Sequence, residues 1–152
     1  TLLANGQILT VGGSVGTTYK FAPWAFGGMI EIKPRTAMLA LNFDPSVSFY
    51  DGELSFNYPI YLKFIFGKNF RVCPTFGFIG RTKTANIKAS TGGTLGLMFE
   101  KRVRENDFVF LKFDYMNEGR KYDSYSPGGS PYQYISYQNS LWISIGYRTI
   151  LF

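Results

Sequence analysis

Residues 54–66 read LSFNYPIYLKFIF, a stretch in which large apolar side chains occupy every second position. The positions from Leu54 to Phe66 in that series are leucine, isoleucine, tyrosine or phenylalanine, and Ser55, Asn57 and Lys63 lie between them. A period of two residues indicates a β-strand whose two faces meet different surroundings. The stretch therefore predicts a strand with one apolar face and one polar face.

The same alternation recurs on both sides of this stretch, and helical periodicity is nearly absent. The further runs cover residues 9–19, 24–33, 37–50, 70–82, 93–101, 108–117 and 135–150. With residues 54–66 they make eight candidate strands. No linker or shift in composition divides the chain, so residues 1–152 are expected to form a single β-barrel domain.

The connections between the runs alternate in length. Residues 33–36, 67–69 and 102–107 form short basic or polar turns, whereas residues 82–92 and 118–134 form longer loops. Transmembrane barrels show this asymmetry between short periplasmic turns and longer external loops. The pattern predicts an all-β fold, an eight-stranded antiparallel up-and-down transmembrane β-barrel.

Side-chain volume indicates which face of the strands points outward. The interior of an eight-stranded barrel is just wide enough for side chains to fill it, and the large apolar face would overfill it. The opposite face is rich in glycine, serine and alanine. We therefore expect the apolar face to meet lipid. A soluble lipocalin-like carrier, with the apolar face inside, is the alternative.

Charged residues occur on the small-residue face, where an unpaired buried charge would be costly. Acids and bases are nearly balanced there, which predicts a network of paired charges in the lumen. Its expected members are Glu31, Lys33, Lys63, Arg71, Arg81, Glu100, Lys112, Asp114 and Arg148. The same face carries large side chains that would block a pore, namely Met29, Tyr61, Met98, Phe110 and Trp142. It also carries Cys73, expected to be an inert buried thiol.

Aromatic residues are unusually abundant, with 15 Phe, 11 Tyr and 2 Trp. Two belts of rings at the membrane interfaces would account for them. Near the long loops the expected belt contains Tyr19, Phe21, Trp24, Phe49, Tyr50, Tyr134 and Tyr137. Near the short turns it contains Phe64, Phe66, Phe70 and Tyr147.

Three prolines lie inside the expected strands, at positions 45, 59 and 74. Each deletes a donor from the hydrogen-bond ladder. Local bulges, or strands that extend beyond the bilayer, would each accommodate them, and the sequence does not decide between these.

The chain contains no histidine and one cysteine, which excludes Ser-His-Asp and Cys-His catalytic sets, histidine zinc sites and internal disulfides. We predict no catalytic residue, no cofactor and no metal site. Sixteen Lys and Arg residues against ten Asp and Glu residues give a net charge of +6. These bases do not cluster on an amphipathic helix, so a nucleic-acid partner is not expected.

Three segments resemble known outer-membrane proteins. Residues 57–67 and 71–80 are similar to two consecutive strands of PorT-like barrels of Bacteroidetes-type bacteria, and residues 143–148 resemble the end of OmpX-type eight-stranded barrels. Thr149 stands where that pattern has its last aromatic residue. The resemblance implies recognition by the barrel-assembly machinery. The residues of this assembly signal would be Gly146, Tyr147, Arg148 and Phe152.

These observations predict a non-enzymatic integral protein of a Gram-negative outer membrane, in contact with lipid and lipopolysaccharide. Its termini and short turns would be periplasmic and its long loops extracellular. The first residues lack a signal-peptide pattern, so a signal peptide is either absent or already removed. The expected function is a small structural or accessory subunit of a larger outer-membrane complex; a stand-alone adhesion or envelope-stabilising barrel is the alternative. The expected partner-contact residues in the longest loop are Tyr122, Tyr125, Tyr132 and Tyr134; capping of the lumen is an equally weighted alternative role for them.

Overall fold

The computed structural model describes residues 7–19, 24–50, 53–82, 89–125, 127–129 and 131–151. Within these ranges it contains eleven β-strands and no helix long and apolar enough to cross a membrane. The strands are β1 (Gln7–Tyr19), β2 (Trp24–Pro34), β3 (Leu39–Phe43), β4 (Ser46–Tyr50), β5 (Glu53–Asn57), β6 (Ile60–Phe64), β7 (Phe66–Gly67), β8 (Phe70–Arg81), β9 (Ser90–Arg102), β10 (Asp107–Tyr125) and β11 (Pro131–Ile150).

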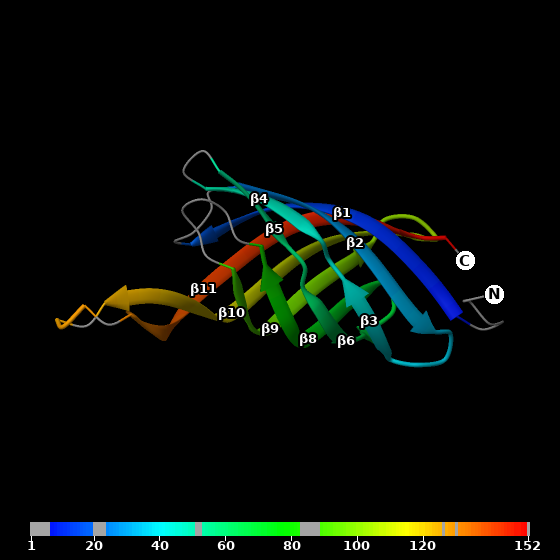
Figure 1. Cartoon of the computed structure of the whole chain (residues 1–152). Coiled ribbons are helices and arrows are strands. Elements are labelled where there is room, and N and C mark those ends of the chain that lie inside the picture. Colours follow the sequence, from blue (N-terminus) through cyan, green and yellow to red (C-terminus); the bar gives the residue numbers. More distant parts are fainter. Residues whose placement is uncertain are drawn as a thin grey trace.

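The strands form one closed antiparallel barrel (Figure 1). β1 pairs with β2 on one side and with β11 on the other, which closes the sheet. β3 and β4 pair with β2 without a change of register between them, so they are two parts of one barrel strand. In the same way, β5, β6 and β7 pair with β8 in one continuous register. The eleven segments are therefore eight barrel strands, and the predicted eight-stranded antiparallel barrel is confirmed.

The strands are staggered relative to one another. A path across the ladders from Leu9 returns to β1 at Tyr19, ten residues further along the strand. The intermediate partners are Ile32, Leu41, Leu62, Phe76, Leu95, Tyr115 and Leu141. Such a stagger accompanies the strand tilt that lets a sheet close, and it determines which side chains share a level in the lumen.

Two of the prolines interrupt the ladder without inserting a residue. Pro45 lies between β3 and β4 and Pro59 between β5 and β6, yet the pairing register is identical on both sides of each break. A bulge would add a residue to one strand, so bulges, one of the two alternatives for these prolines, do not occur at these two positions. The carbonyl oxygens still accept hydrogen bonds, Pro45 from Gly28 at 2.8 Å and Pro59 from Asp44 at 3.2 Å. Pro74 remains inside β8, opposite Leu97.

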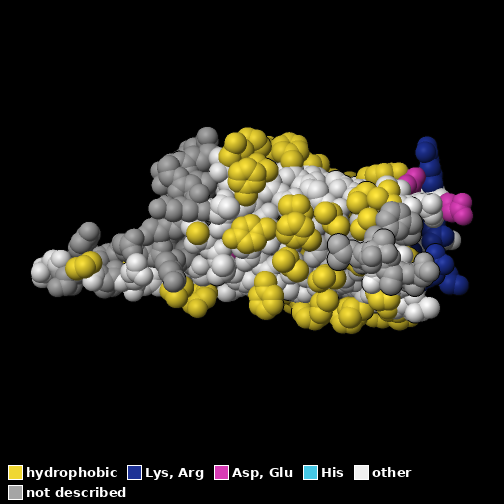
Figure 2. Space-filling model, turned by 45° about the vertical axis from the view of Figure 1, so that its right-hand side comes forward, with side chains coloured by type: hydrophobic (Ala, Val, Ile, Leu, Met, Phe, Trp, Pro, Cys, Tyr) yellow, Lys and Arg dark blue, Asp and Glu magenta, His cyan; other side chains and the backbone are white. Residues whose placement is uncertain are grey.

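The barrel is apolar outside and polar inside. Phe78 and Leu95 are 77% and 65% exposed on the wall, whereas Lys63, Glu100 and Arg148 are 0% exposed in the lumen. Figure 2 shows hydrophobic side chains distributed over the visible wall and charged ones gathered at one end. The predicted assignment of the two faces is confirmed.

Several expected belt residues lie on the outer surface. Trp24, Phe49, Tyr134 and Tyr137 are exposed toward the long-loop end, and Phe66, Phe70 and Tyr147 toward the other end. Phe64 is half-buried and stacks on Phe76 with a centroid separation of 5.9 Å. Phe21 and the side chains of Tyr19 and Tyr50 lie outside the described part of the structure.

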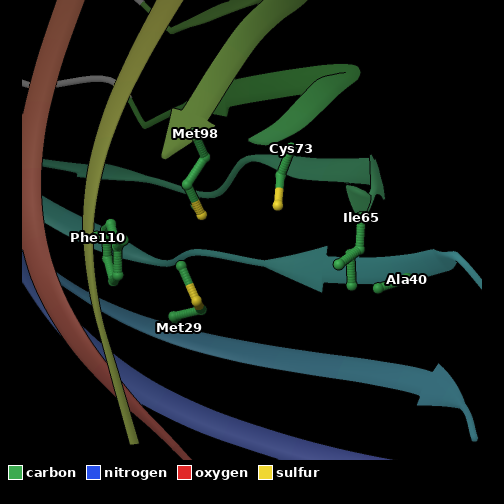
Figure 3. Close-up of a cluster of buried hydrophobic side chains, with 6 residues drawn as sticks. All are labelled: Met29, Ala40, Ile65, Cys73, Met98 and Phe110. Atoms are coloured by element: carbon green, nitrogen blue, oxygen red, sulfur yellow. The ribbon is translucent and has the colours of Figure 1, made fainter. Parts of the chain in front are cut away.

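Apolar side chains also fill part of the lumen. One cluster consists of Met29, Ala40, Ile65, Cys73, Met98 and Phe110, which point into the barrel from different strands (Figure 3). A second cluster consists of Ala25, Ile79, Met116 and Trp142. The expected inward side chains Met29, Tyr61, Met98, Phe110 and Trp142 are all buried. Cys73 is 0% exposed, as predicted.

Inward glycines make room for these large side chains. A Cβ at Gly146 would overlap the Phe110 ring, and one at Gly77 would lie 2.6 Å from Cβ of Tyr61. A Cβ at Gly96 would overlap the Asp114 carboxylate. On the inward face, therefore, a glycine lies beside each of these larger side chains on the neighbouring strand and leaves the space that the larger side chain fills.

The longest expected loop is instead a β-hairpin. The sequence predicted an irregular loop over residues 118–134, but β10 and β11 remain paired from Glu118–Gln138 to Tyr125–Pro131. The hairpin projects beyond the rest of the barrel (Figure 1). The alternation in this region is masked in the sequence by glycine, serine and charged residues, which are weak strand formers.

Candidate functional site in the lumen

Four charged side chains from four strands meet near the short-turn end of the lumen. Glu31 lies on β2, Lys63 on β6, Glu100 on β9 and Arg148 on β11. The Lys63 ammonium contacts the Glu31 carboxylate and lies 2.7 Å from Oε1 of Glu100. The Arg148 guanidinium lies 2.7 Å from Oε1 of Glu31 and 2.5 Å from Oε2 of Glu100. Each acid thus lies between two bases in a closed ring.

This charge ring is electrically balanced and almost wholly withdrawn from solvent. Its side chains are at most 2% exposed. Removing one partner of a buried pair leaves an uncompensated charge and typically costs about 3–5 kcal/mol. The ring therefore connects strands around the barrel circumference, and its own charges are engaged with one another rather than with a ligand.

Guanidinium groups and one aromatic ring lie between the charge ring and the short turns. The Phe108 ring is fully buried, with the guanidinium carbons of Arg71, Arg148 and Arg102 at 4.1, 5.0 and 5.3 Å from its centroid. Arg71 also lies 3.8 Å from Glu100. These cation–π contacts are favourable in a desolvated setting, and they fill this end of the lumen.

A second cluster lies beside the interruption at Pro45. The Lys112 ammonium is 3.1 Å from Asp44 and 2.9 Å from Asp114, and it lies 3.8 Å from the centroid of the Tyr61 ring. The Tyr61 hydroxyl donates a hydrogen bond to Asp44. Lys112 and Asp114 were expected in the network. Asp44 was not among the expected members of the network, and the structure adds it.

A small polar cavity of about 30 Å³ adjoins this second cluster. Its lining residues are Ser14, Asp44, Ser46, Asn57, Pro59, Ile79, Lys112, Asp114, Met116, Trp142 and Ser144. Oδ1 of Asp44 and Oδ1 of Asn57 are buried without a protein partner in the described part of the chain. A polar cavity of this size has room for about two water molecules, which would satisfy these acceptors.

A third cluster lies toward the long hairpin. Arg81 donates to Glu118 at 2.9 Å, and the Ser90 hydroxyl donates to the same carboxylate at 2.6 Å. The sequence placed Arg81 in the lumen correctly but assigned Glu118 to a loop. Continuing the inward series of Lys112, Asp114 and Met116 by two residues would have identified Glu118.

Lys33 is a proposed network member that points elsewhere. Its ammonium donates to the carbonyl oxygens of Pro34, Arg35 and Ala37 at 2.9–3.3 Å, in the turn after β2. Among the described residues it makes no ion pair with a lumen acid. Lys33 therefore stabilises a short turn, and its predicted membership of the lumen charge network is wrong.

The expected contact and assembly residues are only partly described. Tyr134 is 47% exposed on the hairpin, and the side chains of Tyr122, Tyr125 and Tyr132 lie outside the described part of the structure. At the chain end, Tyr147 is exposed on the wall and Phe152 lies outside the described residues. The roles of these residues in contact and assembly stay predictions.

The charged side chains in the lumen neutralise one another. Among the residues that the structure describes, no group of three or more His, Cys, Asp or Glu side chains is placed to hold a metal ion. The acids in the three clusters contact Lys or Arg side chains. The arrangement is a packed polar interior that supports the wall.

Comparisons with solved structures find the same barrel elsewhere. The N-terminal β-barrel domain of Pseudomonas aeruginosa OprF matches with a TM-score of 0.63 at 14% identity, over 93% of this chain and 97% of that one. A major outer membrane protein of Thermus thermophilus matches with a TM-score of 0.63 at 10% identity, over 95% and 99%. No protein-family model matches the chain, and no curated protein matches it. The fold is that of outer-membrane barrels.

Proposed function

We propose that this protein is a non-enzymatic integral protein of a Gram-negative outer membrane. The observation that carries the proposal is the inside-out distribution of side chains. Trp24, Phe78 and Leu95 are each more than half exposed on the wall, while the lumen contains buried ion pairs. In water an apolar wall of this extent would promote aggregation, whereas lipid would cover it. The fold shared with two outer-membrane proteins supports the same placement.

The proposed orientation places the short turns and both chain ends in the periplasm and the long hairpin outside the cell. Known transmembrane barrels have short periplasmic turns and longer extracellular loops. The turns at residues 35–38, 68–69 and 103–106 are short, and the β10–β11 hairpin projects beyond the wall at the other end. Assembly through the chain end, with Gly146, Tyr147, Arg148 and Phe152 as signal, belongs to the same proposal.

Within the membrane we propose that the barrel acts as a structural or accessory subunit of a larger complex. Three charge clusters and two apolar clusters fill the lumen, so a partner would bind to the outer surfaces of the molecule. These surfaces are the wall and the projecting hairpin. The motif similarity in residues 57–67 and 71–80 favours a PorT-like relationship, and residues 143–148 favour an OmpX-like one.

A stand-alone adhesion or envelope-stabilising role is the second candidate. The hairpin favours it, because Ile135 and Tyr137 are 52% and 69% exposed beyond the region where β11 pairs with β1. Tyrosines give large rigid contact areas at a low cost in conformational entropy. In this case the partner would be a surface outside the cell.

Membrane placement is tested by producing the chain without detergent. Aggregation in water, together with folding in detergent micelles or liposomes, is expected. A monodisperse soluble monomer would refute the membrane proposal and support the lipocalin-like alternative.

The accessory role is tested by gentle solubilisation of native membranes followed by affinity purification through a tag on the chain. A larger protein in constant stoichiometry is expected. A variant whose hairpin is shortened between Gly119 and Tyr137 serves as the comparison, since it keeps the barrel ladders below that level. Isolation of the barrel alone from every preparation would favour adhesion or envelope stabilisation.

A further inference from the structure

Among the side chains that the structure describes outside the lumen clusters, the positive charge is concentrated at the short-turn end. Outside the charge ring, the described side chains at this end comprise seven bases and two acids. The bases are Lys33, Arg35, Lys68, Arg71, Lys101, Arg102 and Arg104, and the acids are Glu105 and Asp107. Figure 2 shows Lys and Arg side chains gathered at this end, beside an apolar wall. Arg71 and Arg102 lie on the buried Phe108 ring, whereas the exposed bases Arg35, Lys68, Lys101 and Arg104 form a basic rim.

An apolar groove of about 220 Å³ opens on the outer wall next to this rim. It lies across β8 to β11 and is lined by Phe70, Phe99, Val109, Leu111, Ile145 and Lys101. The Phe70 and Phe99 rings stack with their centroids 6.4 Å apart and form one side of the groove. Its apolar lining suits a hydrocarbon chain.

Lys101 supplies the charge in the lining of the groove, and it is exposed. It lies opposite Phe70 on β8 and opposite Val109 on β10, at the end of β9 nearest the turns. The turn that contains Lys68 is held beside this strand end, because the amide of Arg102 donates to the carbonyl of Asn69 at 2.7 Å. Lys68 and Arg104 thus lie in the two turns that adjoin the end of β9 at Lys101.

We propose that this groove binds an anionic phospholipid of the periplasmic leaflet. One acyl chain lies over Phe99 and Leu111, and the phosphate contacts Lys101, with Lys68 and Arg104 on the adjoining turns. Basic side chains at a membrane surface attract anionic headgroups, and a lysine stem can pack on apolar surface while its ammonium meets the headgroup. The proposal rests on the membrane placement proposed above, and the choice of leaflet rests on the proposed orientation.

The test uses the full chain folded in detergent and examined by native mass spectrometry with added lipids. Phosphatidylglycerol and phosphatidylcholine with identical acyl chains separate headgroup charge from hydrocarbon binding. We expect phosphatidylglycerol to bind preferentially. Equal binding of the two lipids by a folded barrel would overturn the proposed site while leaving the membrane placement intact. Failure of the chain to fold in any detergent or liposome would instead refute the membrane placement.

Lys101→Gln is the variant for the proposed site, and Arg35→Gln is its matched control. Both remove one positive charge from an exposed rim position, but Arg35 lies in the turn after β2, on the other side of the barrel. We expect Lys101→Gln to reduce the preference for phosphatidylglycerol about fivefold, the effect of one basic side chain at an anionic surface, and Arg35→Gln to leave it unchanged. Equal losses in both variants would show general attraction to the rim and overturn the specific site.

A groove-filling variant and a second lipid complete the test. Val109→Trp occupies the groove without changing charge and is expected to reduce binding of both phospholipids. Unchanged phosphatidylglycerol binding by this variant would overturn the role of the groove. Lipid A carries phosphates in the opposite leaflet, so stronger binding of lipid A than of phosphatidylglycerol would overturn the proposed lipid source.

Discussion

Arg148 and Glu31 lie 117 residues apart in the chain, and the guanidinium of one is 2.7 Å from the carboxylate of the other inside the closed barrel. Strand β1 lies between them in the sheet, because its Gly12 pairs with Arg148 on one side and its Thr10 pairs with Glu31 on the other. The contact therefore crosses the seam where the first and last strands close the barrel. It ties the end of the chain to the ring of charges around Lys63 and Glu100.

Removing the arginine from this ring is expected to destabilise the barrel strongly. Arg148→Met leaves Glu31 and Glu100 with one ammonium between them, and the free energy of unfolding should fall by about 3–5 kcal/mol. Urea unfolding in liposomes, followed by tryptophan fluorescence, measures this change. Arg104→Met, at an exposed turn position, is the control and should change it by about 0.5 kcal/mol or less. Similar values for the two variants would contradict the structural role of the ring.

The close approach of Gly146 and Phe110 predicts a steric effect. Gly146→Ala places a methyl group against the ring, inside van der Waals contact, and should cost about 1–3 kcal/mol of unfolding free energy. Gly13→Ala is the matched control, because its Cβ would point outward, with the nearest atom, the carbonyl oxygen of Gly27, 3.6 Å away. Adding Phe110→Leu to Gly146→Ala should recover part of the loss. A Gly146→Ala variant as stable as Gly13→Ala would contradict this packing.

The outer wall of the barrel should tolerate a charged side chain only near the two membrane surfaces. Leu97 lies opposite Pro74 and Phe113 on the outer wall, so Leu97→Arg should cost about 2–4 kcal/mol in a bilayer. Val103→Arg, in the exposed turn after β9, should cost at most about 1 kcal/mol. Reversible unfolding from liposomes provides both values. Equal costs at the two positions would argue against a membrane around Leu97.

The buried thiol should be unreactive in the folded barrel. Cys73 is 0% exposed, so a water-soluble maleimide should add to it only after unfolding. Mass spectrometry of the intact chain measures the addition before and after urea treatment. The double variant Cys73→Ser with Arg35→Cys places the thiol on the exposed rim and should react without urea. Rapid reaction of Cys73 in the folded protein would show that the lumen is open to the reagent.

Shortening the hairpin should separate folding from function. Joining Gly119 to Tyr137 through an Asn-Gly turn removes the projecting residues but keeps the pairs from Met116–Ser140 to the short-turn end. The barrel should still fold, as seen from its faster migration in unheated gel electrophoresis. Partner co-purification should be lost in the accessory-subunit case. Loss of folding would show that the hairpin belongs to the structural core.

Much of the lumen was accessible from the sequence because the alternation assigns each side chain to a face. Lys63, Glu100 and Arg148 were placed inside correctly, and Leu54 and Phe66 outside. Lys33 was assigned to the network by the same alternation, but at the end of β2 its long stem reaches the carbonyl groups of the turn. The alternation of a strand assigns each residue to a face, but it does not predict which groups a long side chain at the end of the strand will reach.

The fold class followed from the sequence alone, because strict alternation, small residues on one face and short turns at one end are compatible with few architectures. Which charges meet one another depended on the folded barrel. Glu31 reaches Arg148 across β1, and Asp44 reaches Lys112 from a strand that is not its neighbour, so both contacts depend on how the strand registers close the barrel. The continuation of β10 through Glu118 was likewise decided by pairing with β11, because long-range hydrogen bonds overrode weak local strand propensity.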